Sequence, residues 1–242
     1  MTKSDTIAIL LSLCSRNMKW NITADIDLFK VFLPSFFNTI SNKYNYKLII
    51  GYDDDDEFII NNIDKIKQRI GIISKFIKLT DCQHNPCKAW NTLLKESVND
   101  ADYFYQIGTD SAIETKNWDS YFINILKKNN NIGICSGVDT IFYIDRILSG
   151  TNGICENVFF HKTHFKIFST LFNKNFKNFF SDDYITKLYY SIDKCFLCPY
   201  VTFKNKHRVN QQKTNRYKAD IVKDWQDVVE KDITILKKYL KV

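Results

Sequence analysis

The sequence contains little glycine and proline, with 7 Gly and 3 Pro among its 242 residues. Both residues mark turns, so their scarcity excludes collagen-like, linker-rich and many-hairpin architectures. Apolar residues make up 45% and charged residues 25% of the chain, which are ordinary values for a globular protein and exclude extensive disorder. The length favours one domain over several. A single mixed α/β domain is therefore predicted.

Long apolar runs are also missing. No run reaches the roughly 18 residues of a membrane-spanning helix, and the stretch from Ile7 to Leu13 is too short for a secretory signal. The seven cysteines are an odd number in a chain too large to need disulfides, so reduced thiols are expected. We therefore expect a cytoplasmic protein without a membrane span.

Arginine is scarce as well: the chain has 29 Lys but only 5 Arg, with a net charge of +7. Arginine is the side chain best suited to grip phosphates and bases, so nucleic acid is a disfavoured partner. Ile, Lys and Asn number 31, 29 and 23, a bias typical of AT-rich genomes such as those of large DNA viruses and parasites. If the protein is viral, its expected location is the host cytoplasm.

The basic residues concentrate near the C-terminus. The stretch from Lys204 to Lys218 holds six Lys or Arg, one His and no acidic residue. Such a stretch is typical either of an anion-binding segment or of a solvated loop. Both interpretations stay open from composition alone.

Short apolar runs alternate with helical spacing over the first 137 residues. The runs predict strands at 6–14, 47–52, 75–79, 102–107 and 132–137, and the helical segments lie at 26–40, at 57–69, from 86 and from 118. Pro34 is expected to kink or divide the first helical segment, and Asn85 with Pro86 predicts a capped helix start. This order predicts helices packed on a mostly parallel, Rossmann-type sheet, with ligands beyond the carboxyl ends of its strands.

The pattern is less regular after Gly137. Short strand-like pieces are expected at 141–144 and 155–160, and helical pieces at 163–172 and 182–191. An amphipathic helix closes the chain, with Trp225, Val229 and Ile233 on its apolar face. We expect one domain with a regular half at 1–137, a less regular half at 138–203, and a basic segment with a terminal helix at 204–242.

Acidic residues follow two of the predicted strands. Residues 53–57 read Asp-Asp-Asp-Asp-Glu after the second strand, and Asp110 follows the fourth in the segment Ile-Gly-Thr-Asp-Ser. An aspartate in such a loop is often a turn former or a helix cap, but these two loops lie where the predicted sheet would hold a ligand.

The first half, with its polar break after the fourth strand, resembles the GT-A-type glycosyltransferases, which bind a nucleotide-diphosphate sugar on a Rossmann-like sheet. In that family an Asp-x-Asp motif at this break holds Mn²⁺ or Mg²⁺ against the diphosphate. Here the matching residues are Gly108, Thr109 and Asp110, without the first carboxylate. The resemblance implies that Asp110 is a metal ligand, that His161 or His164 completes the metal shell, and that Thr109 contacts the nucleotide.

The same resemblance implies that 1–137 is the nucleotide-binding half and 138–203 the acceptor and catalytic half. It also implies further contacts to the donor. An aspartate after the second strand would accept an N–H of the base, while Asp55, Asp56 and Glu57 are expected to be solvated. The C-terminal basic segment would close over the diphosphate. The implied nucleotide-binding residues are Ser12, Ser15 and Arg16, either Asp53 or Asp54, Lys88 and Asn91, and His207 and Arg208.

Asp182 and Asp183 precede a helical piece late in the chain. In inverting members of the family, a carboxylate at the start of a similarly late helix deprotonates the acceptor hydroxyl. Two adjacent aspartates allow one helix cap and one base. We expect Asp182 to cap the helix at Ile185 and Asp183 to be the base.

The predicted activity is therefore metal-dependent transfer of a sugar from a UDP- or GDP-sugar to a hydroxyl of a glycan or protein. Two alternatives remain. A sugar-nucleotide nucleotidyltransferase should carry a glycine-rich loop after the first strand, where this chain reads SRNMKWN, and a catalytically inactive module would bind polyanions through the basic stretch. A zinc site made of Cys82, Cys87, Cys195 and Cys198 is disfavoured, because Phe196 and Leu197 have the character of strand core.

Overall fold

The computed structural model of the chain describes residues 4–141, 153–206 and 220–241. The strands among residues 4–141 are β1 (Thr6–Leu13), β2 (Asn45–Asp53), β3 (Ser74–Leu79), β4 (Tyr103–Gln106), β5 (Ser111–Ile113) and β6 (Ile134–Asp139). The helical segments of this part are η1 (Thr23–Asp25), η2 (Leu28–Phe32), α1 (Leu33–Thr39), α2 (Glu57–Arg69), α3 (Pro86–Ser97) and α4 (Trp118–Lys128). The rest of the described chain forms β7 (Val158–His161), α6 (Thr163–Phe168), α7 (Ser181–Tyr190), β8 (Cys195–Asn205) and α9 (Trp225–Leu240).

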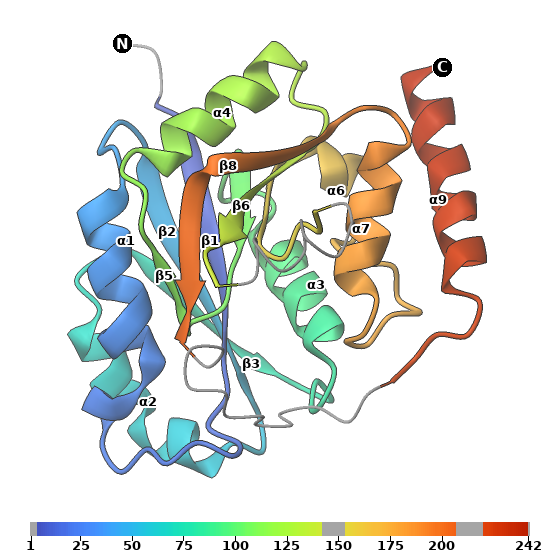
Figure 1. Ribbon diagram of the computed structural model, residues 1–242. Helices are drawn as coiled ribbons and strands as arrows, with labels where there is room; N and C mark the ends of the chain where they lie inside the picture. The colour runs from blue at the N-terminus through green and yellow to red at the C-terminus, as the bar shows by residue number, and fades with distance from the viewer. Residues whose placement is uncertain (1–3, 142–152, 207–219, 242) are drawn as a thin grey trace.

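The described strands form one sheet in the order β3-β2-β1-β4-β7-β6-β8-β5 (Figure 1). The first four of these strands are parallel. β7 runs antiparallel between β4 and β6, while β8 is parallel to β6 and antiparallel to β5. β3 and β5 are the two edges of the sheet. Because the sheet curls, β5 contacts η2 and α1, which follow β1 in the chain.

Helices cover both faces of this sheet. On one face, Ile7, Ile9 and Leu11 of β1 pack with apolar side chains of η2, α1, α2 and α4. On the other face, Ala8 and Leu10 pack with α3, α7 and α9. Successive residues of a strand point to opposite faces, so the unbroken apolar run of β1 reflects burial on both sides.

The α/β fold predicted from the alternating pattern is confirmed. α2 has the predicted bounds. Asn85 caps α3, since its side chain accepts a hydrogen bond from the N–H of Lys88 at 2.9 Å. Pro34 lies in the first turn of α1, directly after η2 ends at Phe32. The backbone stays right-handed helical across this junction, so the helix changes type here but is not divided into two.

The later part of the chain departs from its predicted bounds. The helix expected at 163–172 ends at Phe168, because Ser169 adopts a left-handed backbone conformation with φ of 60°. The helix expected at 182–191 is α7, which begins one residue earlier. The half expected to be irregular contributes β7 and β8 to the central sheet. Of the expected piece at 141–144, residues 142–144 lie outside the described residues.

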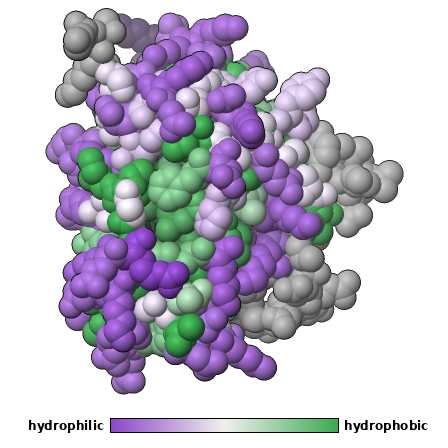
Figure 2. All heavy atoms as spheres, turned by 90° about the vertical axis from the view of Figure 1, so that its left-hand side faces the viewer, coloured by the Kyte–Doolittle hydropathy of each residue, from purple (hydrophilic) through white to green (hydrophobic). Residues whose placement is uncertain are grey.

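The surface is mixed in character. Figure 2 shows the face on the side of α1 and α2, where apolar side chains gather in the middle and polar ones surround them. On α1, Phe37 is 46% exposed. Across the three described ranges, no helix combines the length and apolar character that crossing a membrane requires.

Candidate functional site

Polar side chains gather where the parallel strands end. β1, β2 and β4 run in the same direction, so the residues that follow them emerge together at the carboxyl ends of the parallel strands. These residues are Cys14–Arg16, Asp53–Asp56 and Gly108–Asp110. Neighbouring strands lie about 4.8 Å apart, so the ends of β2 and β4, on either side of β1, are about 10 Å apart. A small ligand can therefore reach all three loops.

Asp56 ties the loop after β1 to α2. Its carboxylate accepts hydrogen bonds from the backbone N–H and the hydroxyl of Ser15, both at 2.6 Å. The same carboxylate caps α2 by accepting from the N–H of Ile59 at 3.1 Å. Asp56 is 4% exposed, so the prediction that it is solvated is wrong. Its buried position follows from its two roles as cap and loop anchor.

Arg16 joins two carboxylates of the loop after β2. Its Nη1 donates to Oδ2 of Asp53 at 2.6 Å, and its Nη2 donates to Oδ1 of Asp55 at 2.7 Å. Burial works against the charge of Arg16, but the hydrogen bond to Asp53 keeps the pKa of Arg16 above its usual range. Burial likewise raises the pKa of Asp53, and Arg16 opposes that rise. The pair therefore fixes Asp53 at the rim with its second oxygen, Oδ1, outside the Arg16 bond.

Ser12 precedes this cluster and lies near the end of β1. It lies on β1 directly opposite Gly51 of β2. The structure thus brings Ser12, Ser15, Arg16 and Asp53, for which the resemblance predicts nucleotide contacts, to one end of the β1–β2 pair.

The other residues expected to contact the nucleotide are held by the protein itself. Asp54 accepts a hydrogen bond from Nε2 of Gln83 at 2.9 Å. The Lys88 ammonium donates to the backbone carbonyl of Asp81 at 2.9 Å, although the side chain is exposed. Asp54 and Lys88 therefore lie near the carboxyl ends of the strands, but each already forms a hydrogen bond within the protein.

Asn91 has a structural role in place of the expected ligand contact. Its Oδ1 accepts from the N–H of Leu171 at 2.9 Å and of Phe172 at 2.8 Å, and its Nδ2 donates to the carbonyl of Phe172 at 2.8 Å. The amide thus pins the segment after α6 to α3. This corrects the prediction that Asn91 binds the nucleotide.

Asp110 and Thr109 lie in the turn after β4, and Asp110 is 8% exposed. The Asp110 carboxylate folds back over Gly108, where an added Cβ would lie only 2.4 Å from Oδ1 of Asp110. A side chain at position 108 therefore conflicts with this conformation. Gly108 stands where the Asp-x-Asp motif has its first aspartate. The Asp110 carboxylate occupies the space that a side chain at position 108 would need.

The two candidate histidine ligands do not join Asp110. His161 pairs with Tyr103, at the start of β4, because β7 runs antiparallel to β4. Asp110 follows the opposite end of β4. His161 Nδ1 lies 2.7 Å from the hydroxyl of Thr163, and burial lowers the pKa of His161 to about 4. The prediction that His161 is a metal ligand is therefore wrong, because the antiparallel direction of β7 places His161 at the opposite end of β4 from Asp110.

His164 is part of the core. Its Nδ1 lies 2.7 Å from the Tyr189 hydroxyl, and its Nε2 lies 2.9 Å from the carbonyl of Thr170. Burial lowers the pKa of His164 to about 4, so the ring is neutral near pH 7. With both nitrogens engaged, His164 cannot ligate a metal without breaking these contacts, which corrects the second expected ligand.

No group of three or more His, Cys, Asp or Glu side chains among the described residues is arranged to hold a metal ion. The cysteines of the zinc alternative do not form such a group either. Cys195 on β8 instead contacts Cys155, with 3.4 Å between the two sulfur atoms.

Asp182 and Asp183 lie in the first turn of α7, which begins beside the start of α3. The N–H of Cys87 donates to the carbonyl of Lys177 at 3.0 Å. Burial raises the pKa of the Cys87 thiol, and the charge of Asp182 adds to that rise. The residue at the cap position of α7 is Phe180, without a side-chain hydrogen bond. The prediction that Asp182 caps this helix is therefore wrong, because the helix begins before it.

One contact, between the start of η2 and the end of β8, could not be predicted from the sequence. The Lys206 ammonium lies 2.6 Å from Oδ1 of Asp27, which is 1% exposed. The N–H of Lys206 donates to the carbonyl of Asp110 at 2.9 Å. These residues are distant in sequence, so no local pattern could reveal the contacts. His207 and Arg208, expected to close over the diphosphate, lie outside the described residues.

No protein-family model and no curated protein matches the chain. Solved structures with the same fold do match. The chain is similar to residues 1–349 of Staphylococcus aureus TarS, a glycosyltransferase, in complex with UDP, with a TM-score of 0.54, 11% identity, and coverage of 96% of this chain and 64% of that one. The match to a second TarS structure covers 95% of this chain and 43% of that one, again with a TM-score of 0.54 and 11% identity.

The chain is also similar to a putative glucose-1-phosphate thymidylyltransferase from Bacillus anthracis in complex with a sucrose. The TM-score is 0.55 at 10% identity, with 91% of this chain and 99% of that chain covered. The likeness shows the fold: the protein has a GT-A-like fold, which nucleotide-sugar transferases share. The chain spans less than two thirds of the length of the TarS structure that contains UDP.

Proposed function

We propose that the protein is a glycosyltransferase that moves a sugar from a UDP- or GDP-sugar to a hydroxyl of a glycan or protein. The observation that carries this proposal is the group of Ser15, Arg16, Asp53 and Asp56 at the carboxyl end of β1 and β2. On a GT-A-like sheet, this is the edge at which a nucleotide binds. The UDP complex of TarS, on the same fold, supports a nucleotide partner.

Asp53 would select the base. Asp53 forms an ion pair with the Arg16 guanidinium at 2.6 Å, and the carboxylate of such a pair acts as an acceptor only. Oδ2 accepts from Arg16, which leaves Oδ1 for a donor such as the N–H of uracil or guanine. Ser12 and Ser15 on the neighbouring loop would line the nucleoside.

Asp110 would face the diphosphate, because it follows β4 on the other side of β1. A Mn²⁺ or Mg²⁺ ion bound there would neutralise the phosphates and stabilise the departing nucleoside diphosphate. The single carboxylate fits an ion that arrives with the nucleotide, since Mg²⁺ in such sites takes one or two protein carboxylates, phosphate oxygens and waters. It does not fit a metal site formed by the protein alone.

Asp183 would take the proton of the acceptor hydroxyl if the reaction inverts the anomeric carbon. It lies in the first turn of α7 with its neighbour Asp182, whose charge reaches the Cys87 thiol. Asp183→Asn should then abolish transfer while nucleotide binding persists.

The decisive experiment measures the melting temperature with UDP, GDP and their sugars, with and without Mn²⁺. A ligand that binds only the folded state at 100 times its dissociation constant adds about 2.7 kcal/mol of stability. We expect one base type to stabilise the parent protein, more strongly with Mn²⁺, and Asp110→Asn to lose the metal-dependent part. Asp64→Asn, on an exposed side chain of α2, is the control and should respond like the parent.

Two results would contradict the proposal. A parent protein that no nucleotide stabilises, but that binds heparin in a strongly salt-dependent manner, would be the inactive polyanion-binding module. An Asp110→Asn variant with an unchanged metal response would remove Asp110 from the donor site.

A sugar-nucleotide nucleotidyltransferase is the second candidate, favoured by the likeness to the thymidylyltransferase. It would release pyrophosphate from a nucleoside triphosphate and a sugar 1-phosphate. The glycosyltransferase would instead release a nucleoside diphosphate from a nucleotide sugar. Assaying both products with the same protein separates the two.

A further inference from the structure

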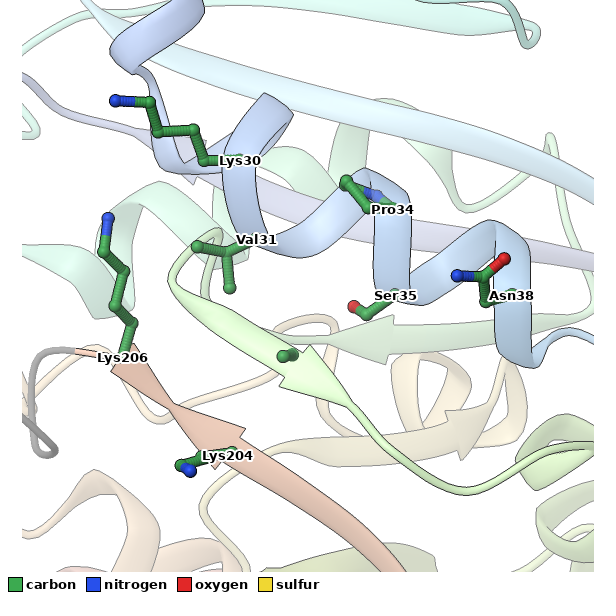
Figure 3. Close-up of a pocket in the computed structure, with 8 residues that line it drawn as sticks. Lys30, Val31, Pro34, Ser35, Asn38, Lys204 and Lys206 are labelled. Atoms are coloured by element: carbon green, nitrogen blue, oxygen red, sulfur yellow. The ribbon is translucent and has the colours of Figure 1, made fainter.

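A pocket of about 370 Å³ lies between the η2–α1 segment and the pair β5–β8. Its volume falls within the roughly 300–1,000 Å³ typical of small-molecule sites. Its lining contains three lysines and no acidic side chain (Figure 3): Lys30, Val31, Pro34, Ser35, Asn38, Ala112, Lys204 and Lys206. The nucleotide contacts proposed above use none of these residues.

Two of the three lysines are held in place by aspartates outside the lining. The Lys206 ammonium lies 2.6 Å from Oδ1 of the buried Asp27, and the Lys30 ammonium lies 2.6 Å from Oδ1 of Asp25. Lys204 forms no ion pair with any residue of the described chain. The pocket therefore presents one cation without an acidic partner beside two that are already oriented, an arrangement that favours an anion.

The remaining walls suit a sugar ring. Asn38 on α1 is exposed and can exchange hydrogen bonds with hydroxyls, whereas Val31 and Pro34 offer apolar surface. The Ser35 hydroxyl is already used: it donates to the carbonyl of Phe32 at 2.8 Å and accepts from the N–H of Ile113 at 3.0 Å. These bonds fix the α1 wall against β5.

The pocket adjoins the turn that carries Asp110. Ala112 pairs with Lys204 across β5 and β8, and the N–H of Lys206 donates to the carbonyl of Asp110 at 2.9 Å. The nucleotide group lies on the β1–β2 side of this turn, and the pocket lies on the β5–β8 side. A molecule in the pocket would thus approach the transferred sugar without overlapping the nucleotide.

We propose that this pocket binds the acceptor, and that the acceptor is a saccharide carrying an anionic group such as a phosphate, sulfate or carboxylate. The proposal rests on the proposed glycosyltransferase function, whose acceptor it restricts to an acidic class. Lys204 makes the main contact to the anion, with Lys30 and Lys206 beside it. Asn38 binds the hydroxyls of the ring.

The test is an NMR titration of the ¹⁵N-labelled full chain at constant ionic strength. The probes are glucose 6-phosphate, glucose 6-sulfate, glucuronate, glucose and inorganic phosphate. At least one acidic sugar should bind more tightly than both glucose and inorganic phosphate, and the tightest of the three identifies the anionic group. Equal binding of glucose, or inorganic phosphate binding as tightly as the best acidic sugar, would overturn the proposal.

Lys204→Gln should weaken binding of the best acidic sugar about tenfold, the usual loss for one charge-assisted hydrogen bond. Lys95→Gln, at an exposed lysine near the end of α3, removes the same charge elsewhere and should change the dissociation constant by less than about twofold. Equal effects of the two substitutions would show a general charge effect and overturn the pocket.

UDP and GDP binding, measured on the same samples, separates the two proposals. A parent chain that binds the acidic sugar through Lys204 but neither nucleotide would refute the donor function and leave an acidic-saccharide pocket. A chain that binds a nucleotide but no acidic sugar would refute this pocket alone.

Discussion

Residues 4–139 and the described residues after them build one sheet in two different ways. In the first region β1, β2 and β3 pair in chain order, β4 returns to pair with β1, and helices make the parallel crossovers. In the second region β7 runs between β4 and β6, and β8 pairs with both β6 and β5. The first region thus supplies the parallel strands β3-β2-β1-β4, whereas β7 and β8 of the second region join β5 and β6 to them and complete the sheet.

The polar residues of the two regions differ accordingly. Ser15, Arg16 and Asp53 of the first region lie at the open edge of the sheet. His164 and Asp232 of the second region are buried and bond other parts of the core, Asp232 accepting from the Tyr184 hydroxyl at 2.7 Å. A histidine in the second region is therefore poor evidence for a ligand, while an aspartate after a parallel strand is better evidence.

Phe159→Ala should cause the largest loss of stability among substitutions that affect the contact between the two regions. Phe159 of β7 is fully buried and its ring packs against Tyr103, Trp118 and Phe122 of the first region. Its truncation should cost about 3–5 kcal/mol of unfolding free energy. Because both regions share this core, urea unfolding followed by tryptophan fluorescence and by circular dichroism should remain a single transition.

The control for this substitution is Phe179→Ala, at a side chain that is 47% exposed. It should change the unfolding free energy by less than about 0.5 kcal/mol. Two separate transitions in Phe159→Ala would show that the first region is stable without β7.

Asp56→Ala should have the next largest effect. It removes the cap of α2 and the two hydrogen bonds to Ser15, and we expect a loss of about 2–3 kcal/mol. Asp55→Ala removes an exposed partner of Arg16 and should cost less than about 1 kcal/mol. Urea denaturation compares the two, and equal losses would contradict the structural role of Asp56.

His164 should make stability depend on pH. Burial lowers its pKa in the folded state to about 4, against about 6.5 in the unfolded chain. Below pH 6.5 the unfolded chain binds a proton that the folded chain does not, so the stability falls as the pH falls from 6.5 to 4 and is unaffected by this group above that range. Between pH 7.5 and 5.5 the loss should be about 1 kcal/mol.

Urea denaturation of the parent and of His164→Gln at these two pH values checks this expectation. Burial also lowers the pKa of His161 to about 4, so part of the dependence should persist in the variant. If the difference between the two pH values is the same in parent and variant, His164 is not the source.

Lys162→Gln should have the smallest effect, although it also connects the two regions. The Lys162 ammonium lies 2.7 Å from Oδ1 of Asp102, but the side chains are 36% and 35% exposed. Solvent and salt weaken such a pair, so the expected cost is at most about 0.5 kcal/mol. A loss above about 1 kcal/mol would mean that surface contacts, besides the shared core, hold β7 to β4.

Local chemistry explains which predictions from sequence succeeded. The apolar run of β1 and the Asn85 cap each depend on residues within a few positions of one another. The common edge of the loops after β1, β2 and β4 followed from the parallel order of the strands.

The failures come from long-range contacts. Asn91 bonds Leu171 and Phe172, and Lys206 meets Asp27, across separations that no local pattern records. His161 and His164 were predicted to be ligands because the direction of β7 and the burial of His164 could not be seen in the sequence. Both are set by packing against distant strands and helices. Nor could residues alone show that the Asp110 carboxylate would occupy the space above Gly108.

The position of β3 at one margin of the sheet has a consequence for how copies of the protein behave together. Its outer row of backbone amides and carbonyls could template pairing with another polypeptide. Lys75 and Lys78 are exposed on this strand, and two such strands brought side by side would place like charges in contact. The arrangement should therefore oppose growth of the sheet into fibrils when the protein is concentrated.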